Sequence, residues 1–319
     1  MTSPLISIIT PSFNQAQFLE ETLRSVLEQG YPNLEYIVID GASTDGSVDI
    51  IRKYADRLTY WVSEPDHGQA EAINKGFAQA HGEIVAWLNS DDVYRPGALA
   101  AAAAALQANP QLGFVFSDVQ AIDADGQVTN LMRFGDWGLD ELMCFNIIGQ
   151  PGVFMRRSAL EKAGGMDANF HYLLDHQLWL RIAERSPVHY LPVTLAAGRF
   201  HAAAKNVAHA DRFGQEAYAI VEWMKTRPGL QSRYQRMEKR VWAGAHRINA
   251  RYLLDGGQPK AALAAYGKSL KTHPATALVE WHRMVYALLC LVGLDRLKNV
   301  YLKIRTALRK KRDPQAFQR

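Results

Sequence analysis

The chain has 319 residues, of which 48% are hydrophobic, 21% charged and 10% aromatic. This composition is typical of a globular protein with a sizeable core, and it excludes a disordered or fibrous chain. The net charge is +4, but residues 296–319 contain nine Lys or Arg and one Asp, a net +8, which leaves −4 for residues 1–295. A mildly acidic main body argues against nucleic acid as a partner.

The cysteines and the apolar runs indicate a cellular location. Cys144 and Cys290 are far apart, which excludes a disulfide framework or zinc-finger spacing and suits a reducing cytoplasm. No basic residue precedes the first apolar stretch, Leu5–Thr10, so it predicts a strand and not a signal peptide. The longest apolar run, Met284–Leu294, has 11 residues, whereas a membrane-spanning helix needs about 20. We expect a cytoplasmic protein.

Short apolar runs alternate with helical patterns in the first part of the chain. The predicted strands are residues 5–10, 35–40, 58–62, 84–88 and 114–116, and the predicted helices are residues 15–29, 47–54, 69–80 and 96–108. This alternation predicts an α/β fold with a mostly parallel central sheet flanked by helices. Ligands of such sheets bind at the carboxyl ends of the strands.

The alternation fades beyond residue 125. Residues 123–126 predict a hairpin turn, residues 138–145 and 174–184 predict helices, and residues 188–191 predict an extended segment. After about residue 205 nearly the whole pattern is helical. We therefore expect two domains, a catalytic domain over residues 1–205 and a helical C-terminal region over residues 206–319.

Acidic residues follow several of the predicted strands. Asp40 ends the second strand, Asp66 follows the third, and Asp91 and Asp92 follow the fourth. Carboxylates that converge on one edge of a sheet repel each other unless a cation lies among them. The turn after the first strand contains no glycine, which argues against a dinucleotide-binding fold.

Four residues, Asp91, Asp92, Asp175 and His201, each have a functional and a structural interpretation. Asp91 and Asp92 are hard oxygen ligands suited to Mg²⁺ or Mn²⁺, but Asp is also common in turns and at helix starts. Asp175 lies where a helix is predicted to begin, so it suits a general base and equally a residue favoured by the helix dipole. His201 suits a metal ligand, or a histidine at the surface.

Taken together, several segments resemble family 2 glycosyltransferases of the GT-A fold. In chain order they are Thr10–Asn14, Glu35–Gly46, Ser63–Gly68, Trp87–Asp92, Gln150–Arg157, Asp175–Arg181, and Arg199–His201 with Lys205. The likeness covers about residues 5–205, or about two-thirds of the chain. The agreement of many segments in one order carries the resemblance, since each motif alone is short.

The resemblance implies an inverting hexosyltransferase that uses a nucleotide-diphosphate-sugar and Mg²⁺ or Mn²⁺. The nucleotide would be bound by Thr10, Pro11, Phe13, Asp40, Asp66, Asp91 and Lys205. Asp92 and His201 would hold the metal ion, and Asp175 would be the catalytic base. The acceptor would be a glycan or a lipid-linked sugar in bacterial surface polysaccharide or lipopolysaccharide assembly.

The sequence departs from the family pattern at two positions. Asn89 stands where the acidic motif often begins with Asp, and Ile73 stands where many members have Arg. Two other functions stay open: a catalytically silent nucleotide- or glycan-binding protein on the same fold, and a sugar nucleotidyltransferase. The second would usually have a basic, Gly-rich loop after the first strand, and this chain has none.

The end of the chain combines apolar and basic residues. An apolar stretch from Trp281 to Leu291 precedes the basic residues, among which Leu297, Val300, Tyr301, Ile304 and Leu308 recur at helical spacing. An amphipathic helix of this kind predicts peripheral docking on an anionic membrane, here the inner face. The alternative is that the apolar side packs on the catalytic domain and the charges are solvated.

Overall fold

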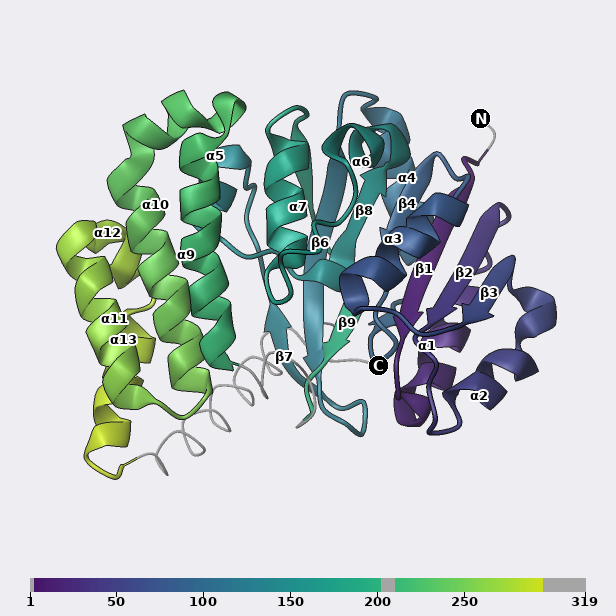
Figure 1. The fold of residues 1–319 in the computed structure, drawn as a ribbon, viewed down its shortest axis with the longest axis horizontal. Helices are drawn as coiled ribbons and strands as arrows, with labels where there is room; N and C mark the ends of the chain where they lie inside the picture. The colour runs from purple at the N-terminus through teal and green to yellow at the C-terminus, as the bar shows by residue number, and fades with distance from the viewer. Residues whose placement is uncertain (1–2, 202–209, 295–319) are drawn as a thin grey trace. The chain divides into compact units, whose positions relative to one another are not determined.

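The computed structural model describes residues 3–201 and 210–294, which are drawn in colour in Figure 1. The chain divides into two compact units. The α/β unit comprises Met1–Gly138 and Ile148–Arg199, and the helical unit comprises Leu139–Ile147 and Phe200–Arg319. Predictions that depend on Lys205 or on residues 295–319 concern positions outside the described residues.

The α/β unit is built on one mixed sheet, which has nine strands in the described part of the chain. Their order is β3-β2-β1-β4-β8-β6-β9-β5, and β7 pairs with β6. The strands are β1 (Ile6–Ser12), β2 (Leu34–Asp40), β3 (Tyr60–Ser63), β4 (Ile84–Trp87), β5 (Val93–Tyr94), β6 (Phe114–Ile122), β7 (Val128–Met132), β8 (Val153–Arg156) and β9 (Val188–Arg199).

The strands that carry candidate site residues end at one edge of this sheet. β3, β2, β1 and β4 are parallel neighbours. β8 is antiparallel to both β4 and β6, so β6 runs in the same direction as β4, and β9 is parallel to β6. We call the side where β1, β2, β3, β4, β6 and β9 end the carboxyl edge; it faces the bottom of Figure 1.

Helices cover both faces of the sheet, as the sequence predicts. They are α1 (Ala16–Leu27), α2 (Ser47–Lys53), α3 (Gln69–Gln79), α4 (Ala98–Ala108), α6 (Arg157–Ala163) and α7 (Leu174–Ala183), with short 3₁₀ turns η1 (Ala55–Arg57) and η2 (Gln150–Gly152). Alternating residues of each strand point to opposite faces. Ile8 of β1 therefore packs in a core with residues of α1 and α4, whereas Ile9 lies against Gly76 of α3.

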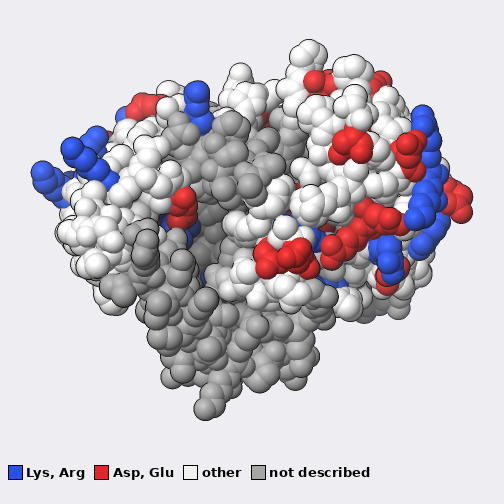
Figure 2. Space-filling view, turned by 90° about the horizontal axis from the view of Figure 1, so that it is seen from below, with Lys and Arg blue, Asp and Glu red and all other residues white. Residues whose placement is uncertain are grey.

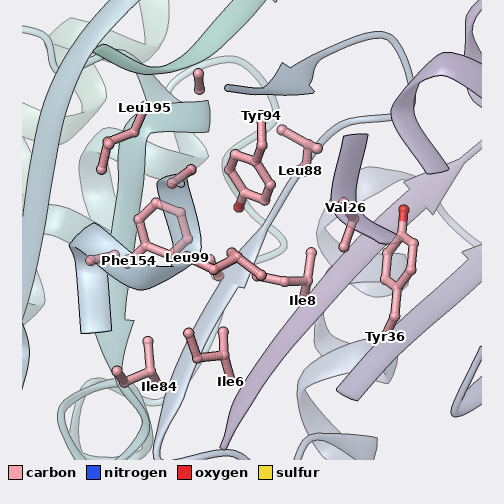
Figure 3. Packing of buried hydrophobic residues seen from close by; sticks show 14 of the residues in the cluster. Ile6, Ile8, Val26, Tyr36, Ile84, Leu88, Tyr94, Leu99, Phe154 and Leu195 are labelled. Atoms are coloured by element: carbon pink, nitrogen blue, oxygen red, sulfur yellow. The ribbon is translucent and has the colours of Figure 1, made fainter. Parts of the chain in front are cut away.

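One hydrophobic core of this unit joins the sheet to α1, α2 and α4 (Figure 3). Ile8 of β1 and Leu99 of α4 are completely buried in it. The rings of Tyr94 and Phe154 stack with centroids 5.2 Å apart, which links β5 to β8. Buried apolar area of this kind is the main stabilising contribution to the fold.

The sheet extends beyond the strands that the sequence predicts. β6 continues from Phe116 to Ile122, and all nine of its residues are buried, although Ser117, Asp118 and Gln120 are polar. β9 continues past Pro192 to Arg199, with a register irregularity opposite Ser117–Val119 that accommodates the proline. β5, β8 and α6 are short and were not predicted.

The helical unit contains α5 (Leu139–Met143), α9 (Ala210–Thr226), α10 (Pro228–Asp255), α11 (Pro259–Thr272), α12 (Pro274–Leu278) and α13 (Trp281–Leu291). Glu280 is buried, and it accepts hydrogen bonds from Arg251 Nε at 2.9 Å and from the Tyr266 hydroxyl at 2.8 Å. Burial alone would raise the pKa of Glu280, but the Arg251 charge and hydrogen bond outweigh burial and lower it. This ion pair joins α10, α11 and the start of α13.

Arg247 explains why residues 139–147 group with the later helices. Its guanidinium donates to the carbonyl of Phe145 at 3.0 Å and to Oδ1 of Asn146 at 2.9 Å. Gly244 lets α10 come close to residues 139–147, because a Cβ at this position would lie 2.1 Å from the carbonyl oxygen of Cys144. Within residues 3–201 and 210–294, no helix combines the length and apolar content needed to cross a membrane.

Candidate active site

Two predicted site residues, Phe13 and Asp66, meet at the carboxyl edge beside Gly41, the residue that follows β2. A Cβ atom on Gly41 would lie 2.8 Å from Oδ2 of Asp66 and 3.3 Å from the ring of Phe13. Only glycine allows this close approach, so the backbone after β2 borders both side chains. Phe13 is 61% exposed, and an aromatic ring open to solvent can stack on a planar ligand.

Asp40 is the last residue of β2 and is fully buried. Its carboxylate accepts hydrogen bonds from the Ser43 backbone at 2.9 Å, the Ser43 hydroxyl at 2.6 Å and the Ser63 hydroxyl at 2.7 Å. These neutral donors hold the buried carboxylate and join the loop after β2 to the end of β3. The hydrogen bonds from Ser43 and Ser63 therefore fix the conformation of the loop after β2.

The structure places Thr10 in β1, as predicted, and continues the strand through Pro11 to Ser12, beyond its predicted end. Thr10 and Pro11 are buried, and the Thr10 hydroxyl lies 2.9 Å from the hydroxyl of Tyr36 on β2. Burial raises the pKa of Tyr36 above its usual range. The side chain of Thr10 is thus engaged within the sheet, while Phe13 and Asn14 are exposed to solvent.

Asp91 and Asp92 follow β4 at the same edge. Asp92 is only 6% exposed, and its Oδ1 accepts the backbone N–H of Arg199 at 2.9 Å. Burial and the neighbouring Asp91 both disfavour the charged form, so the pKa of Asp92 is raised well above its usual value. Two adjacent carboxylates with few compensating charges are the arrangement that a divalent cation stabilises.

Arg199 is a structural partner of this acidic pair that sequence reasoning did not identify. Its side chain is 1% exposed. Nε donates to the carbonyl of Asp91 at 2.9 Å, and Nη1 donates to the carbonyls of Asp123 and Ala124 at 3.1 Å each. Nη2 pairs with Glu21 of α1 at 2.6 Å. A single guanidinium therefore holds the loop after β4 against α1 and the β6–β7 turn.

Asp175 lies in the first turn of α7, on the sheet face opposite α4. Ile182, near the end of this helix, lies against Gly113, which precedes β6 and marks the opposite edge of the sheet. Because α7 rises about 1.5 Å per residue, Asp175 lies roughly 10 Å from Ile182 in the direction of the carboxyl edge. The start of α7 thus belongs to the edge at which β4 ends.

An aromatic stack connects α7 to β4. The rings of Trp87 and Trp179 lie 5.2 Å apart with an interplanar angle of 21°. Asp175 is four residues before Trp179 and so lies on the same side of α7, one turn closer to the carboxyl edge. Asp91 and Asp92 follow Trp87 in the same direction. The structure thereby brings the acidic pair and Asp175 to one end of this stack.

His201 is half-buried and lies at the beginning of the helical unit, two residues after Arg199. Its role as a metal ligand stays a prediction. Lys205 lies outside the described residues. Within residues 3–201 and 210–294, no three Asp, Glu, His or Cys side chains lie close enough together to hold a metal ion by themselves. Mg²⁺ and Mn²⁺ sites often use one or two carboxylates with phosphate oxygens, so the Asp91–Asp92 pair fits such an ion.

Figure 2 views the molecule from the side of the carboxyl edge. Acidic side chains form a row across the visible face of the α/β unit, at the right of the picture. Lys and Arg side chains gather beside this row, at the right-hand margin of the same view.

The sheet order, the acidic pair after β4 and the carboxylate at the start of α7 define a glycosyltransferase fold of the GT-A type. The chain is similar to the solved structure of the mannosyltransferase PcManGT from Pyrobaculum calidifontis in complex with GDP-Man and Mn²⁺. The TM-score is 0.62, and the sequences are 24% identical, with 92% of this chain and 88% of that chain covered.

Sequence relatives establish the family. Residues 7–162 match the family described as Glycosyl transferase family 2. The chain is 32% identical over 200 residues to the uncharacterized glycosyltransferase MT1564 of Mycobacterium tuberculosis, covering 57% of this chain and 71% of that protein. It is also 32% identical over 215 residues to the O-antigen biosynthesis protein RfbC of Myxococcus xanthus, covering 66% of this chain. This chain belongs to glycosyltransferase family 2, and it spans 16% of the length of RfbC.

Proposed function

We propose that this protein transfers a sugar from a nucleotide-diphosphate-sugar to an acceptor hydroxyl, with inversion at the anomeric carbon. One observation carries the proposal: the exposed ring of Phe13, the acidic pair and Asp175 all lie at the carboxyl edge of one sheet. Phe13 and Asp66 would bind the nucleotide, with Asp40 shaping the pocket. Residues 1–205 would form the catalytic domain.

Asp175 would act as the general base. Its carboxylate would accept the proton from the acceptor hydroxyl as the oxygen attacks the anomeric carbon. The C–O bond to the sugar forms while the bond to the nucleoside diphosphate breaks, and the leaving group departs on the opposite side. A carboxylate of ordinary basicity can serve when proton transfer is concerted with departure of the leaving group.

Asp91 and Asp92 would hold a divalent metal ion, with His201 as a further ligand. When bound, the ion would supply positive charge to the departing diphosphate. The reach of the chain supports the inclusion of His201: the backbone N–H of Arg199 contacts Asp92, and two residues span at most about 7 Å. Lys205 would add a positive charge near the phosphates. The Mn²⁺ in the PcManGT complex supports metal use.

The acceptor would be a glycan or a lipid-linked sugar in bacterial surface polysaccharide assembly. The similarity to RfbC, an O-antigen biosynthesis protein of Myxococcus xanthus, supports this proposal. An acceptor attached to lipid would confine the reaction to a membrane surface, where a peripheral enzyme has an advantage. This makes the location of the protein at the inner face of the membrane part of the proposal.

The surface of α13 supports membrane docking. Trp281, Val285, Leu288 and Val292 are between 45% and 68% exposed. Their spacing of four, three and four residues places them on one side of the helix. On the other side, Ala287 is buried in a cluster with Leu254 and Ala262 of α10 and α11. We call Trp281, Val285, Leu288 and Val292 the apolar stripe. These side chains therefore point to solvent.

An anionic membrane fits the apolar stripe better than a second copy of the chain. The residues that follow it in sequence, 296–319, carry a net charge of +8. Two such segments brought together would repel each other, whereas each basic residue near an anionic leaflet contributes about 1 kcal/mol to attachment. The apolar stripe and the charge of the following segment thus indicate the same occupant.

A panel of nucleotide-diphosphate-sugars tests the proposed enzyme function. A donor should raise the melting temperature in the presence of Mn²⁺, and the enzyme should release its nucleoside diphosphate when an acceptor is supplied. NMR of the product would show the anomeric configuration opposite to that of the donor. Donor binding without any release of nucleoside diphosphate would identify a catalytically silent binding protein instead.

A further inference from the structure

Asn89 stands at a position where the family resemblance leads to the expectation of aspartate, and its amide lies in a row of polar side chains. We propose that Asn89 is a positioning residue, which orients the carboxylate of Asp92 through a hydrogen-bonded row of amides and is not itself a metal ligand. The inference rests on the proposed function, because it concerns the residues that would hold the metal ion.

A backbone carbonyl determines which way the amide groups of this row are oriented. Gln150 Nε2 lies 2.8 Å from the carbonyl oxygen of Trp87. A carbonyl oxygen only accepts hydrogen bonds, so Gln150 must present its NH₂ group there. Its Oε1 is then the atom that faces Asn89, at 3.2 Å from Nδ2. Asn89 must therefore present its own NH₂ group to Gln150.

The same NH₂ group of Asn89 reaches the acidic pair. Nδ2 lies 3.4 Å from Oδ2 of Asp92, and on the other side Oδ1 of Asn89 accepts a hydrogen bond from Gln69 Nε2 at 2.8 Å. Both ends of the amide are thus engaged, and its oxygen is directed to α3. The ligand oxygens of this loop are left to Asp91 and Asp92.

The carboxylate of Asp92 is held at both oxygens. Oδ1 accepts from the Arg199 backbone at 2.9 Å, and Oδ2 accepts from Asn89. Each carboxylate oxygen can accept about two hydrogen bonds or ligand contacts, so capacity for a metal ion remains. Hydrogen bonds of this type behind a ligand orient it toward the metal and tune the affinity.

An aspartate at position 89 could not replace the amide. An ionised carboxylate only accepts, so it would face the Oε1 of Gln150 and the carboxylate of Asp92 with no proton between them. Gln150 could not turn to help, because Trp87 requires its NH₂ group. The hydrogen-bond pattern explains why an amide stands here in this chain.

Direct Mn²⁺ binding to the purified full-length protein, measured by calorimetry without donor, tests the proposal. Asn89→Ala and Gln150→Ala should each raise the dissociation constant by about 10-fold or more. Because both substitutions interrupt one row, the double variant should bind Mn²⁺ no more weakly than the weaker single variant. Additive losses in the double variant would contradict a shared row.

Asn89→Asp gives the decisive comparison. If residue 89 were a metal ligand, an added carboxylate would tighten Mn²⁺ binding; a positioning role predicts weaker binding, as for Asn89→Ala. Asn74→Ala is the matched control, since Asn74 lies on α3, as Gln69 does, but bonds the backbone of Met166 with both ends of its amide. It should leave the Mn²⁺ affinity unchanged, whatever it does to the melting temperature.

NMR of side-chain amides separates this inference from the proposed function. In protein labelled with ¹⁵N-asparagine, the Asn89 NH₂ signals should shift and exchange faster with solvent after Gln150→Ala, and stay unchanged after Asn74→Ala. Absence of Mn²⁺ binding by the wild-type protein would refute the proposed metal site. The Asn89 signals would still show whether Asn89 and Gln150 belong to one hydrogen-bonded row. Unchanged Asn89 signals in the Gln150→Ala variant would overturn the proposed positioning role of Asn89.

Discussion

The backbone amide of Arg199 donates a hydrogen bond to the carboxylate of Asp92 at 2.9 Å, although 107 residues separate the two in sequence. The Arg199 side chain bonds the carbonyl of Asp91 as well. The end of β9 is therefore attached to the loop after β4 by backbone and side chain together. Folding of the last strand completes the geometry of the acidic pair.

Replacing Arg199 by Met should destabilise the α/β unit by about 3 kcal/mol, because buried carbonyls lose a charged donor. Methionine keeps much of the apolar length of the side chain, so the loss reports on the hydrogen bonds. Urea unfolding followed by circular dichroism measures the change. Arg24→Met is the control, since Arg24 forms an exposed ion pair with Glu28 on α1 and its variant should unfold like the wild type. Equal stability of the two variants would contradict the role of Arg199.

Asp175→Asn should lower the rate of sugar transfer by about 10²- to 10⁴-fold, the usual contribution of a general base. The substitution is close to isosteric and removes the base without altering the nucleotide pocket. Donor affinity, measured by calorimetry, should stay within about twofold of the wild type, because the step lost is proton transfer. Near-normal transfer by a well-folded variant would exclude Asp175 as the base.

Asp92→Ala should remove both metal-dependent binding of a nucleoside diphosphate and turnover. The buried carboxylate is the member of the acidic pair that Arg199 holds in place. Asp56→Ala serves as the control, because Asp56 lies in η1 before β3, at the other end of that strand, and is exposed. Wild-type enzyme treated with EDTA should lose activity and regain it with Mn²⁺. Full turnover by enzyme verified to be metal-free would show that the reaction needs no ion.

Stability should depend on pH through Glu35. Burial alone would raise the pKa of Glu35, but hydrogen bonds from the Ser7 hydroxyl and from the backbone and ring of His81 outweigh burial and lower it. A lowered carboxyl pKa contributes stability above the unfolded-state value, about 4.3, and this contribution is lost as the pH falls through the folded-state value. Glu35→Gln should therefore destabilise the protein more at pH 7 than at pH 3. An equal loss of stability at both values, in urea unfolding, would refute the role of its charge.

Membrane docking should depend on the apolar stripe of α13. The double variant Val285→Glu/Leu288→Glu should weaken co-sedimentation with vesicles containing anionic lipid by at least about 10-fold, since two exposed apolar side chains that would enter the membrane surface become charged. Leu5→Glu, which alters an exposed leucine of the α/β unit, should sediment like the wild type. Transfer to a water-soluble acceptor should stay unchanged in both. Undiminished sedimentation of the double variant, or equal binding to neutral vesicles, would reject this surface.

The sequence by itself determined the first half of the α/β unit. Alternation of apolar runs and helical patterns predicts β1, β2, β3 and β4 and the helices between them, because these elements depend on local periodicity and on Gly or Pro at their ends. Parallel strands of this kind end at one edge. The sequence could therefore also indicate that Asp40, Asp66 and Asp92 would lie at the same side of the sheet.

Tertiary structure alone decided the second half. Asp118 continues β6 as a buried acid because the Tyr190 hydroxyl donates to it at 2.7 Å from 72 residues away. Burial and this hydrogen bond raise the pKa of Tyr190 to about 12. β9 continues past Pro192 because β6 supplies a partner on both sides of the irregularity. In a local sequence pattern, polar residues and a proline predict the end of a strand. Only a partner from a distant segment can offset the free-energy cost of placing them in the sheet.

The need for distant partners also explains why the sequence predicts the types of residue in the site but not their arrangement. The sequence names the acids, whereas the hydrogen bonds of Asp92 with Arg199 and of Asn89 with Gln150 join segments 107 and 61 residues apart. A hydrogen bond needs donor and acceptor atoms within about 3.5 Å of each other. Periodicity within one segment carries no information on which distant segment will meet that distance, so the fold had to supply it.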